Sequence, residues 1–589
     1  MPAPTLERGR TPGLNGGWIK PVGQVADTLK QLAGWKRWLA AVTAGALSTL
    51  AMPPFFLWPI LFVTLPALVW LIEGARSDAH RDELESAAAL DWKPPARAAL
   101  AGWLFGFGFH VAGLYWLREA FLVTGGNLAL LWPLGVIGLP AYLALFHAAA
   151  AAAAAAVPGS TARRVLALGL ALAVTEWLRG HVLTGFPWNV LGISLTWPLP
   201  LMQSVSVFGI YGLTLIAVIV FAMPAALLAM PDRGAGGSAA AVMVAAAPLC
   251  LLALFGAYRL SIPVPPNVAG VHLRLVQPNI PQRAKWQQER QREFLDAHIA
   301  LTRVGLTDTA AATSGVVWRS WPGDPKGSAV AADVRPRERP TITHVIWPEA
   351  AMPFVPLRYP EVLADLGKML PRGAQLLAGI LRTEGRWPND DFRAFNSLAI
   401  FNDDGQNTAV YDKIHLVPFG EYLPFQAVLE SIGLKALTRQ RGGFAPGPSP
   451  RPLVKIAGLP PASVLICYEA VFPGAVVQGP QRPGVLINVT NDGWFGNSTG
   501  PRQHLHQARL RTVEEGLPLL RVANNGISAV FDAYGRELAR LDLDVAGIID
   551  TRLPGAIPPP IYARLGDLTF VILWIAGAIG LFMMRRRAG

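Results

Sequence analysis

The chain has 589 residues, of which 52% are hydrophobic and only 15% are charged. A soluble domain carries about 25% charged residues, so this composition indicates that much of the chain lies in lipid. The formal net charge is +12, but no basic helix or stacking platform accompanies it, which excludes nucleic acid as a partner and fits contact with anionic lipid.

The two cysteines, Cys250 and Cys467, lie in unlike surroundings and predict no disulfide framework. The absence of HExxH and CxxC motifs predicts no metal or other cofactor.

Apolar stretches divide the chain. A membrane-spanning helix needs about 20 mostly apolar residues. Seven candidate spans precede residue 261 and an eighth lies near the end, at residues 38–51, 55–72, 98–122, 128–157, 165–183, 209–230, 239–260 and 568–584. We therefore predict a membrane domain over residues 1–260, a polar domain over residues 261–567, and a C-terminal transmembrane helix with a basic tail over residues 568–589.

Basic residues in short loops predict the orientation, because they favour the cytoplasmic side. They precede the first span, lie between spans two and three, four and five, and six and seven, and follow span eight. All these groups lie on one side if the N-terminus is cytoplasmic. Seven crossings then place the polar domain outside, and the first span would serve as the signal sequence.

The polar domain shows apolar, β-rich runs with helical stretches between some of them. The runs are residues 273–276, 344–347, 375–378, 397–401, 463–466 and 485–489, and a helix is predicted over residues 287–304. This pattern predicts an α/β sandwich. Residues 305–340 are rich in Ala, Gly, Pro and charge and are interpreted as a mobile insertion.

Three predicted strand ends carry reactive side chains. Glu349 follows a strand in HVIWPEAAMPF, Lys413 and Glu421 lie in VYDKIHLVPFGEYLPF, and Cys467 follows a strand in SVLICYEAVFP. A nucleophilic thiol needs a base to take its proton and a cation to stabilise developing negative charge. Glu, Lys and Cys supply these roles together, although Cys467 alone could be a core cysteine, and His415 offers an alternative base.

These motifs resemble the nitrilase, or carbon–nitrogen hydrolase, superfamily, and the helices around them resemble the apolipoprotein N-acyltransferase family. Further local matches are QPNIPQ followed by Trp286, FNSLAIF with Asn396, NVTNDGWFG with Trp494, RVANNGISAV, and GFPWNVLG between membrane helices. The resemblance implies a multi-pass helical membrane domain of about eight helices joined to an αββα sandwich that carries a Glu–Lys–Cys triad.

By this resemblance, Cys467 is the nucleophile, Glu349 the general base, and Lys413 an oxyanion donor assisted by the backbone N–H of Tyr468. Glu421 would orient Lys413. Glu469, Trp286, Asn396 and Trp494 are supporting or substrate-binding candidates, but Glu421 and Glu469 could be structural carboxylates and the aromatic residues could be core. Phe425 lies in an aromatic loop, residues 419–425, that we expect to contact lipid.

The implied reaction is the last step of bacterial lipoprotein maturation. A phospholipid would acylate the thiol, and the resulting thioester would acylate the α-amine of a diacylglyceryl-cysteine on an apolipoprotein. The enzyme would lie in the bacterial inner membrane with its catalytic domain in the periplasm. The main alternative is a membrane-tethered amidase or nitrilase that acts on a small amide; a transporter fits less well because the triad is intact.

Overall fold

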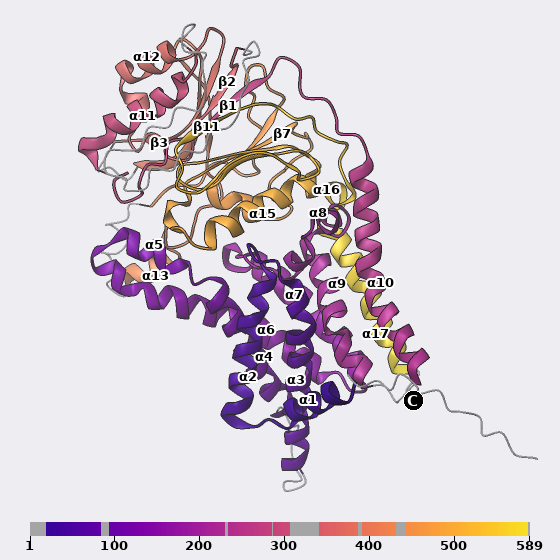
Figure 1. Cartoon of the computed structure of the whole chain (residues 1–589). Coiled ribbons are helices and arrows are strands. Elements are labelled where there is room, and N and C mark those ends of the chain that lie inside the picture. The colour runs from indigo at the N-terminus through magenta and orange to yellow at the C-terminus, as the bar shows by residue number, and fades with distance from the viewer. Residues whose placement is uncertain are drawn as a thin grey trace, which may run out of the picture.

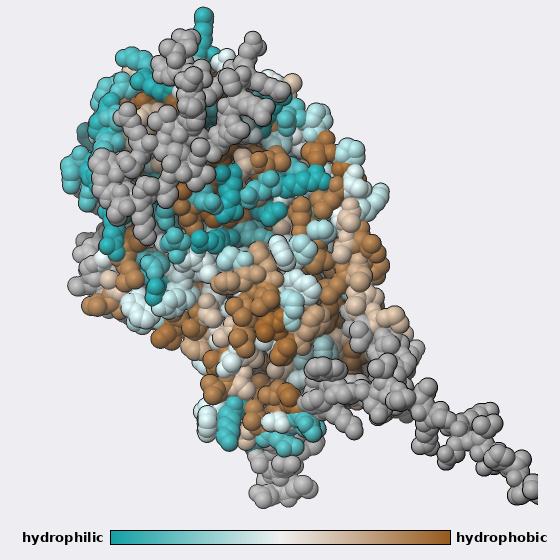
Figure 2. Space-filling view, in the orientation of Figure 1, coloured by the Kyte–Doolittle hydropathy of each residue, from teal (hydrophilic) through white to brown (hydrophobic). Residues whose placement is uncertain are grey.

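The computed structural model describes residues 19–83, 93–229, 234–285, 287–306, 341–386, 391–431 and 443–586. One half of the molecule is helical and the other half contains two β-sheets, which sit on one end of the helices (Figure 1). Apolar side chains dominate the helical half of the face in Figure 2, and polar side chains dominate the sheet half. This separation is expected when one half lies in lipid and the other in water.

The helical half is built mainly from the N-terminal part of the chain. Its helices there are α1 (Ile19–Gln31), α2 (Gly34–Ser48), α3 (Leu61–Glu83), α4 (Lys93–Gly113), α5 (Leu117–Thr124), α6 (Leu139–Ala156), α7 (Thr161–His181), α8 (Leu199–Met202), α9 (Val205–Leu228) and α10 (Gly234–Ser261). The C-terminal helices α16 (Ile561–Leu565) and α17 (Leu568–Arg586) return to this bundle, where α17 packs against α7 and α9.

Several helices can span a membrane, so the protein is a membrane protein. Within the described residues, four helices are long and apolar enough, at Trp58–Arg76, Ala129–Ala156, Thr161–Thr184 and Val205–Leu228. The bent pair Pro95–Gly113 and Leu117–Val123 makes a fifth if it is counted as one span. Ala246–Ser261 and Leu568–Met584 are shorter apolar helices, and α2 has only 15 residues. The total of eight spans therefore stays a prediction.

The predicted span at residues 98–122 is broken. Helix α4 ends at Gly113, and α5 leaves it with a bend of 48°. Between them, Leu114 and Trp116 are buried in an apolar cluster with Tyr468 and Phe472 from the sheet half. Burial of these side chains offsets the loss of helical hydrogen bonds at the break. A sequence pattern of hydropathy alone does not reveal this contact.

The sheet half contains a six-stranded and a five-stranded sheet. The first has the order β11-β1-β2-β3-β4-β5 and the second the order β10-β9-β8-β7-β6. The strands are β1 (His272–Gln277), β2 (His344–Ile346), β3 (Gln375–Glu384), β4 (Arg393–Phe401), β5 (Asn407–Asp412), β6 (Ala462–Ile466), β7 (Val485–Thr490), β8 (Leu519–Ala523), β9 (Ser528–Phe531), β10 (Glu537–Leu541) and β11 (Gly547–Arg552). Each predicted β-run overlaps one of these strands.

The two sheets pack face to face, with helices on the outer faces. Side chains from both sheets share one core, including Leu275, Leu398, Val464 and Ile487. The outer face of the first sheet packs against α11 (Gln291–Arg303) and α12 (Pro360–Met369), and that of the second against α15 (Gly500–Glu515). The parallel strands β6 and β7 are buried on both faces, which explains their continuous apolar runs. The predicted αββα sandwich is confirmed.

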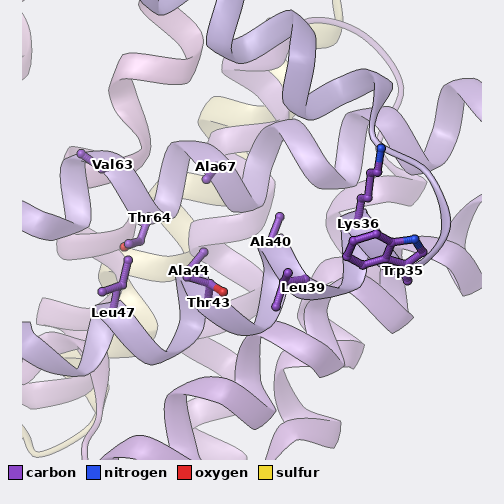
Figure 3. Close-up of a pocket in the computed structure, with 10 residues that line it drawn as sticks. All are labelled: Trp35, Lys36, Leu39, Ala40, Thr43, Ala44, Leu47, Val63, Thr64 and Ala67. Atoms are coloured by element: carbon purple, nitrogen blue, oxygen red, sulfur yellow. The ribbon is translucent and has the colours of Figure 1, made fainter.

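A groove of about 430 Å³ lies on the helical half, between α2 and α3 (Figure 3). Its lining is Trp35, Lys36, Leu39, Ala40, Thr43, Ala44, Leu47, Val63, Thr64 and Ala67. The lining contains none of the predicted site residues and is mainly apolar, as expected of a helix surface that faces lipid. The predicted reactive side chains lie elsewhere, at strand ends of the sandwich.

Candidate active site

The three predicted reactive side chains come from both sheets. Glu349 lies three residues after β2, Lys413 directly follows β5, and Cys467 directly follows β6. All three are buried, with exposed fractions of 6%, 1% and 7%. Since β2 and β5 belong to the first sheet and β6 to the second, the sandwich itself brings the carboxylate and the ammonium to the thiol.

Lys413 is held between two carboxylates. Its Nζ lies 2.9 Å from Glu421 Oε1 and 3.6 Å from Glu349 Oε1. Asn396 Nδ2 donates to the same two oxygens, at 2.8 Å to Glu349 and 3.0 Å to Glu421. The predicted residues Asn396 and Glu421 thus belong to one network that fixes both Glu349 and Lys413.

The charges of this network set the resting state of the thiol. Burial raises the pKa of Cys467, and the nearby Glu349 carboxylate raises it further, against the opposing effect of Lys413. Burial also raises the pKa of Glu349, although Lys413 opposes it. Burial lowers the pKa of Lys413, but Glu421, Glu349 and Cys467 outweigh it and leave that pKa above its ordinary value. The resting site therefore holds a neutral thiol beside a carboxylate of increased basicity and a fixed cation.

Cys467 lies on a sharp turn between β6 and the 3-10 helical turn Cys467–Val471, with φ of +51°. Such a backbone strains a residue with a side chain and is typical of functional sites. The Thr490 hydroxyl donates to Asp492 Oδ1 at 3.0 Å, and His504 Nε2 lies 3.1 Å from the Cys467 carbonyl oxygen. His504 is held in turn by Asp492, which also accepts a hydrogen bond from Arg521. Arg521 is the first residue of the RVANNGISAV segment, whereas no motif in the sequence points to His504.

Glu469 connects the two strand ends that carry Lys413 and Cys467. Its carboxylate accepts hydrogen bonds from the backbone N–H groups of Ile466, Ile414 and His415, and from the Tyr411 hydroxyl. It also forms a buried ion pair with Arg451, at 3.1 Å. Glu469 thus holds the residue before Cys467 against the two residues after Lys413.

His415, whose backbone N–H donates to Glu469, is a poor candidate for the base. Its ring stacks on Phe472, with centroids 3.8 Å apart, and burial lowers its pKa to about 4. Its Nε2 has no hydrogen-bond partner among the described residues. No hydrogen bond joins the His415 ring to Cys467 in the part of the chain that the structure describes, so the geometry favours Glu349 over His415.

The turn that carries Cys467 also contacts the helical half of the molecule. The Tyr468 hydroxyl donates to the Gly185 carbonyl oxygen at 3.1 Å, at the start of GFPWNVLG. The indole N–H groups of Trp116 and Trp188 both donate to Gln503 Oε1, at 3.1 and 2.7 Å. Gln503 directly precedes His504, so one turn of α15 contacts both the membrane loops and the Cys467 backbone. Gln503 is another contact that sequence reasoning missed.

The remaining predicted residues lie around this centre. Phe419 and Phe425 are 61% and 66% exposed, each with a left-handed backbone, and Trp494 is half-buried. Trp286 and residues 307–340 of the predicted insertion lie outside the described residues. Cys250 is exposed on the apolar helix α10. No cluster of three or more metal-ligating side chains occurs within the part of the chain that the structure describes.

The chain combines membrane-spanning helices with an αββα sandwich whose strand ends carry Glu349, Lys413 and Cys467. These features together define a membrane-embedded enzyme of the carbon–nitrogen hydrolase class. Residues 275–556 match the carbon–nitrogen hydrolase family model, and residues 44–223 match the model of the apolipoprotein N-acyltransferase N-terminal domain. The chain belongs to the apolipoprotein N-acyltransferase family, and it is an acyltransferase of that kind.

Relatives of that name match almost the whole chain. The protein from Bradyrhizobium diazoefficiens is 46% identical over 96% of this chain and 98% of its own, and that from Rhodopseudomonas palustris is 43% identical over the same shares. Among solved structures, an amidase from Nesterenkonia sp. AN1 aligns over 53% of this chain and 100% of its own, at 18% identity and a TM-score of 0.31.

Proposed function

We propose that this acyltransferase uses a phospholipid as acyl donor and passes the acyl group through a thioester on Cys467 to the N-terminal amine of a diacylated apolipoprotein. The observation that carries the proposal is the buried Cys467 turn, which contacts a membrane loop through Tyr468 and lies in the electrostatic field of Glu349 and Lys413. A thiol at that position can meet substrates that diffuse in the bilayer.

In the first half-reaction, Glu349 takes the proton of the Cys467 thiol as the sulfur attacks the ester carbonyl of the phospholipid. Lys413 and the backbone N–H of Tyr468 stabilise the resulting oxyanion. The intermediate collapses, the carbon–oxygen bond breaks, and the departing lysophospholipid oxygen takes the proton from Glu349. Glu421 and Asn396 support this step because both bond the groups that act in it.

In the second half-reaction, the α-amine of the diacylglyceryl-cysteine attacks the thioester. Glu349 takes a proton from the amine as an amide bond forms. The carbon–sulfur bond breaks and the proton passes to the sulfur, which restores the thiol. Dividing one transfer between two bulky lipids into two steps lets a single lipid occupy the site at a time.

The setting of the site supports a lateral entry for lipid. Exposed Phe419 and Phe425 flank Glu421 on the loop of residues 419–425, which is closed by a hydrogen bond from the Phe419 N–H to the Tyr422 carbonyl. Apolar side chains exposed beside a buried polar site are suited to acyl chains. The membrane region, residues 1–260 and 568–589, would anchor a catalytic domain of residues 261–567 on the periplasmic side of the inner membrane.

The test is acyl-enzyme formation by the full-length protein in detergent with phospholipid alone. Intact-mass spectrometry should show one added acyl chain that hydroxylamine removes, since hydroxylamine cleaves thioesters. Cys467→Ala should give no adduct, whereas Cys250→Ser should give the wild-type adduct. Glu349→Gln should form it at least 100-fold more slowly, because the thiol loses its base. An unmodified wild-type protein under these conditions would contradict the thioester scheme.

A further inference from the structure

A second lysine lies beside the proposed base. Lys285 follows β1 in the turn that continues QPNIPQ, and its side chain is completely buried. Its Nζ donates a hydrogen bond to the backbone carbonyl oxygen of Glu349, at 3.0 Å. A buried ammonium is costly unless it is paired, and the carboxylate of Glu349 is the opposite charge with which it interacts.

The segment that carries Lys285 follows β1 of the six-stranded sheet and is held by residues of the five-stranded sheet. Gln282 Oε1 accepts a hydrogen bond from Asn491 Nδ2 at 2.6 Å, after β7. Asn524, after β8, bonds both the N–H and the carbonyl of Ile280. These contacts fix the turn of Lys285 relative to the five-stranded sheet. The proposed chemistry does not involve QPNIPQ, and these contacts give that segment a structural role, which is to hold the Lys285 turn in place.

The backbone on which Lys285 acts is tightly constrained. Ala350, directly after Glu349, has φ of +47°, and a side-chain carbon on Gly379 would lie 2.7 Å from Glu349 Cα. The Glu349 turn is therefore pressed against β3 on one side and hydrogen-bonded by Lys285 at its carbonyl. Without that donor, the buried carbonyl would lose a charge-assisted hydrogen bond.

We propose that Lys285 is a positioning residue for the acyl transfer: it holds the Glu349 turn, and its positive charge sets the pH range in which Glu349 can accept the thiol proton. The proposal rests on the role of Glu349 as the base. Four groups act on the Glu349 carboxylate or respond to it, namely Lys413 after β5, Glu421 in the following loop, Lys285 after β1, and the Cys467 thiol after β6.

The sign of the effect follows from these charges. Burial lowers the pKa of Lys285 to about 8, so the group is still mainly a cation at neutral pH. Burial raises the pKa of Glu349, and the charge of Lys285 opposes this and so favours the ionised form, which is the form that accepts a proton. Removal of the charge should therefore raise the pKa of Glu349. The rate of thiol activation falls at low pH as Glu349 becomes protonated, and this acidic limb of the pH–rate profile should move to higher pH.

The experiment measures the rate at which iodoacetamide alkylates Cys467 between pH 5 and 9, in full-length protein carrying Cys250→Ser. Lys285→Gln keeps a donor but removes the charge, and should move the acidic limb upward by about one pH unit. Arg283→Gln removes an exposed charge two residues away and should leave the limb unchanged. If Lys285→Gln does not fold, Lys285→Met should show the same shift.

The proposal would be overturned if the acidic limb of Lys285→Gln lay at the same pH as in the wild type and the alkylation rate were lowered equally at every pH. Lys285 would then have a purely structural role. Glu349→Gln separates this result from a failure of the proposed function. That variant should lose the acidic limb altogether. If Glu349→Gln kept the wild-type acidic limb, the assignment of Glu349 as the base would be wrong. If Glu349→Gln lost the limb but Lys285→Gln kept it at the wild-type pH, only the role of Lys285 would be refuted.

Discussion

Glu469→Gln tests how far the site depends on the residues behind it. The substitution keeps the size of the side chain and removes its charge. Arg451, which is buried and paired with Glu469 at 3.1 Å, would become an uncompensated cation. One carboxylate oxygen would also become an NH₂ group that faces N–H donors, such as those of Ile414 and His415 on one oxygen or Ile466 on the other.

Breaking a buried ion pair by removal of one partner costs about 3–5 kcal/mol. Each kcal/mol corresponds to about 2–4 °C in a large domain, so the apparent unfolding midpoint should fall by about 10 °C. Glu384→Gln is the matched control, because Glu384 pairs with Arg382 at 2.6 Å but is half exposed. Its midpoint should change by less than about 2 °C, as expected of a surface pair worth under about 1 kcal/mol.

The assay is thermal unfolding of the full-length proteins in one detergent at one scan rate, with acyl transfer measured well below both midpoints. Transfer by Glu469→Gln should fall at least ten-fold while the protein is still folded, because Glu469 holds the backbone that follows Lys413 and the backbone that precedes Cys467. Adding Arg451→Met should recover part of the lost stability, since it removes the unpaired charge. A midpoint within 2 °C of wild type, with full activity, would refute the reasoning.

The same carboxylate predicts a pH dependence. Burial raises the pKa of Glu469, but the ion pair with Arg451 and the backbone hydrogen bonds outweigh it, so the pKa lies below its ordinary value. The stabilisation is present above the ordinary pKa of about 4.3 and is lost as pH falls through the lowered pKa. Unfolding midpoints of wild type and Glu469→Gln should therefore converge as pH falls below about 4. A gap that widened with acidification would contradict this sign.

Further predictions address the rest of the site and its orientation. Lys413→Ala should lower the rate of acyl-enzyme formation, followed by intact-mass spectrometry, by 100-fold or more, because it removes an oxyanion donor worth about 3–4 kcal/mol. A near-normal rate would exclude that role for Lys413. Phe425→Ala should slow acylation by a long-chain phospholipid more than acylation by a small activated ester, whereas Glu421→Ala should slow both; equal loss with both donors in Phe425→Ala would make the loop structural. A reporter that works only outside the cytoplasm should be active when inserted within residues 305–340 and inactive when fused after residue 587, and the reverse pattern would place the catalytic domain in the cytoplasm.

Much of this protein can be predicted from the sequence because its signals are local. Long apolar stretches report burial in lipid whatever their neighbours, and apolar runs of five residues or so report strands covered on both faces. The β6 and β7 runs are examples, and the motifs around Glu349, Lys413 and Cys467 place reactive groups at the strand ends. Trp286 was also predicted, but it lies outside the described residues.

Tertiary structure alone decided which groups meet across the two sheets and across the two halves of the chain. Lys285 reads as an ordinary charge after QPNIPQ, yet its ammonium reaches the Glu349 backbone from 64 residues away. Gln503 lies 315 residues from Trp188 and bonds its indole. At the break after Gly113, Trp116 is buried in one apolar cluster with Tyr468 and Phe472, which directly follow β6. Such contacts depend on how the sandwich and the helices pack, and hydropathy and local motif carry no information about partners so distant in the chain.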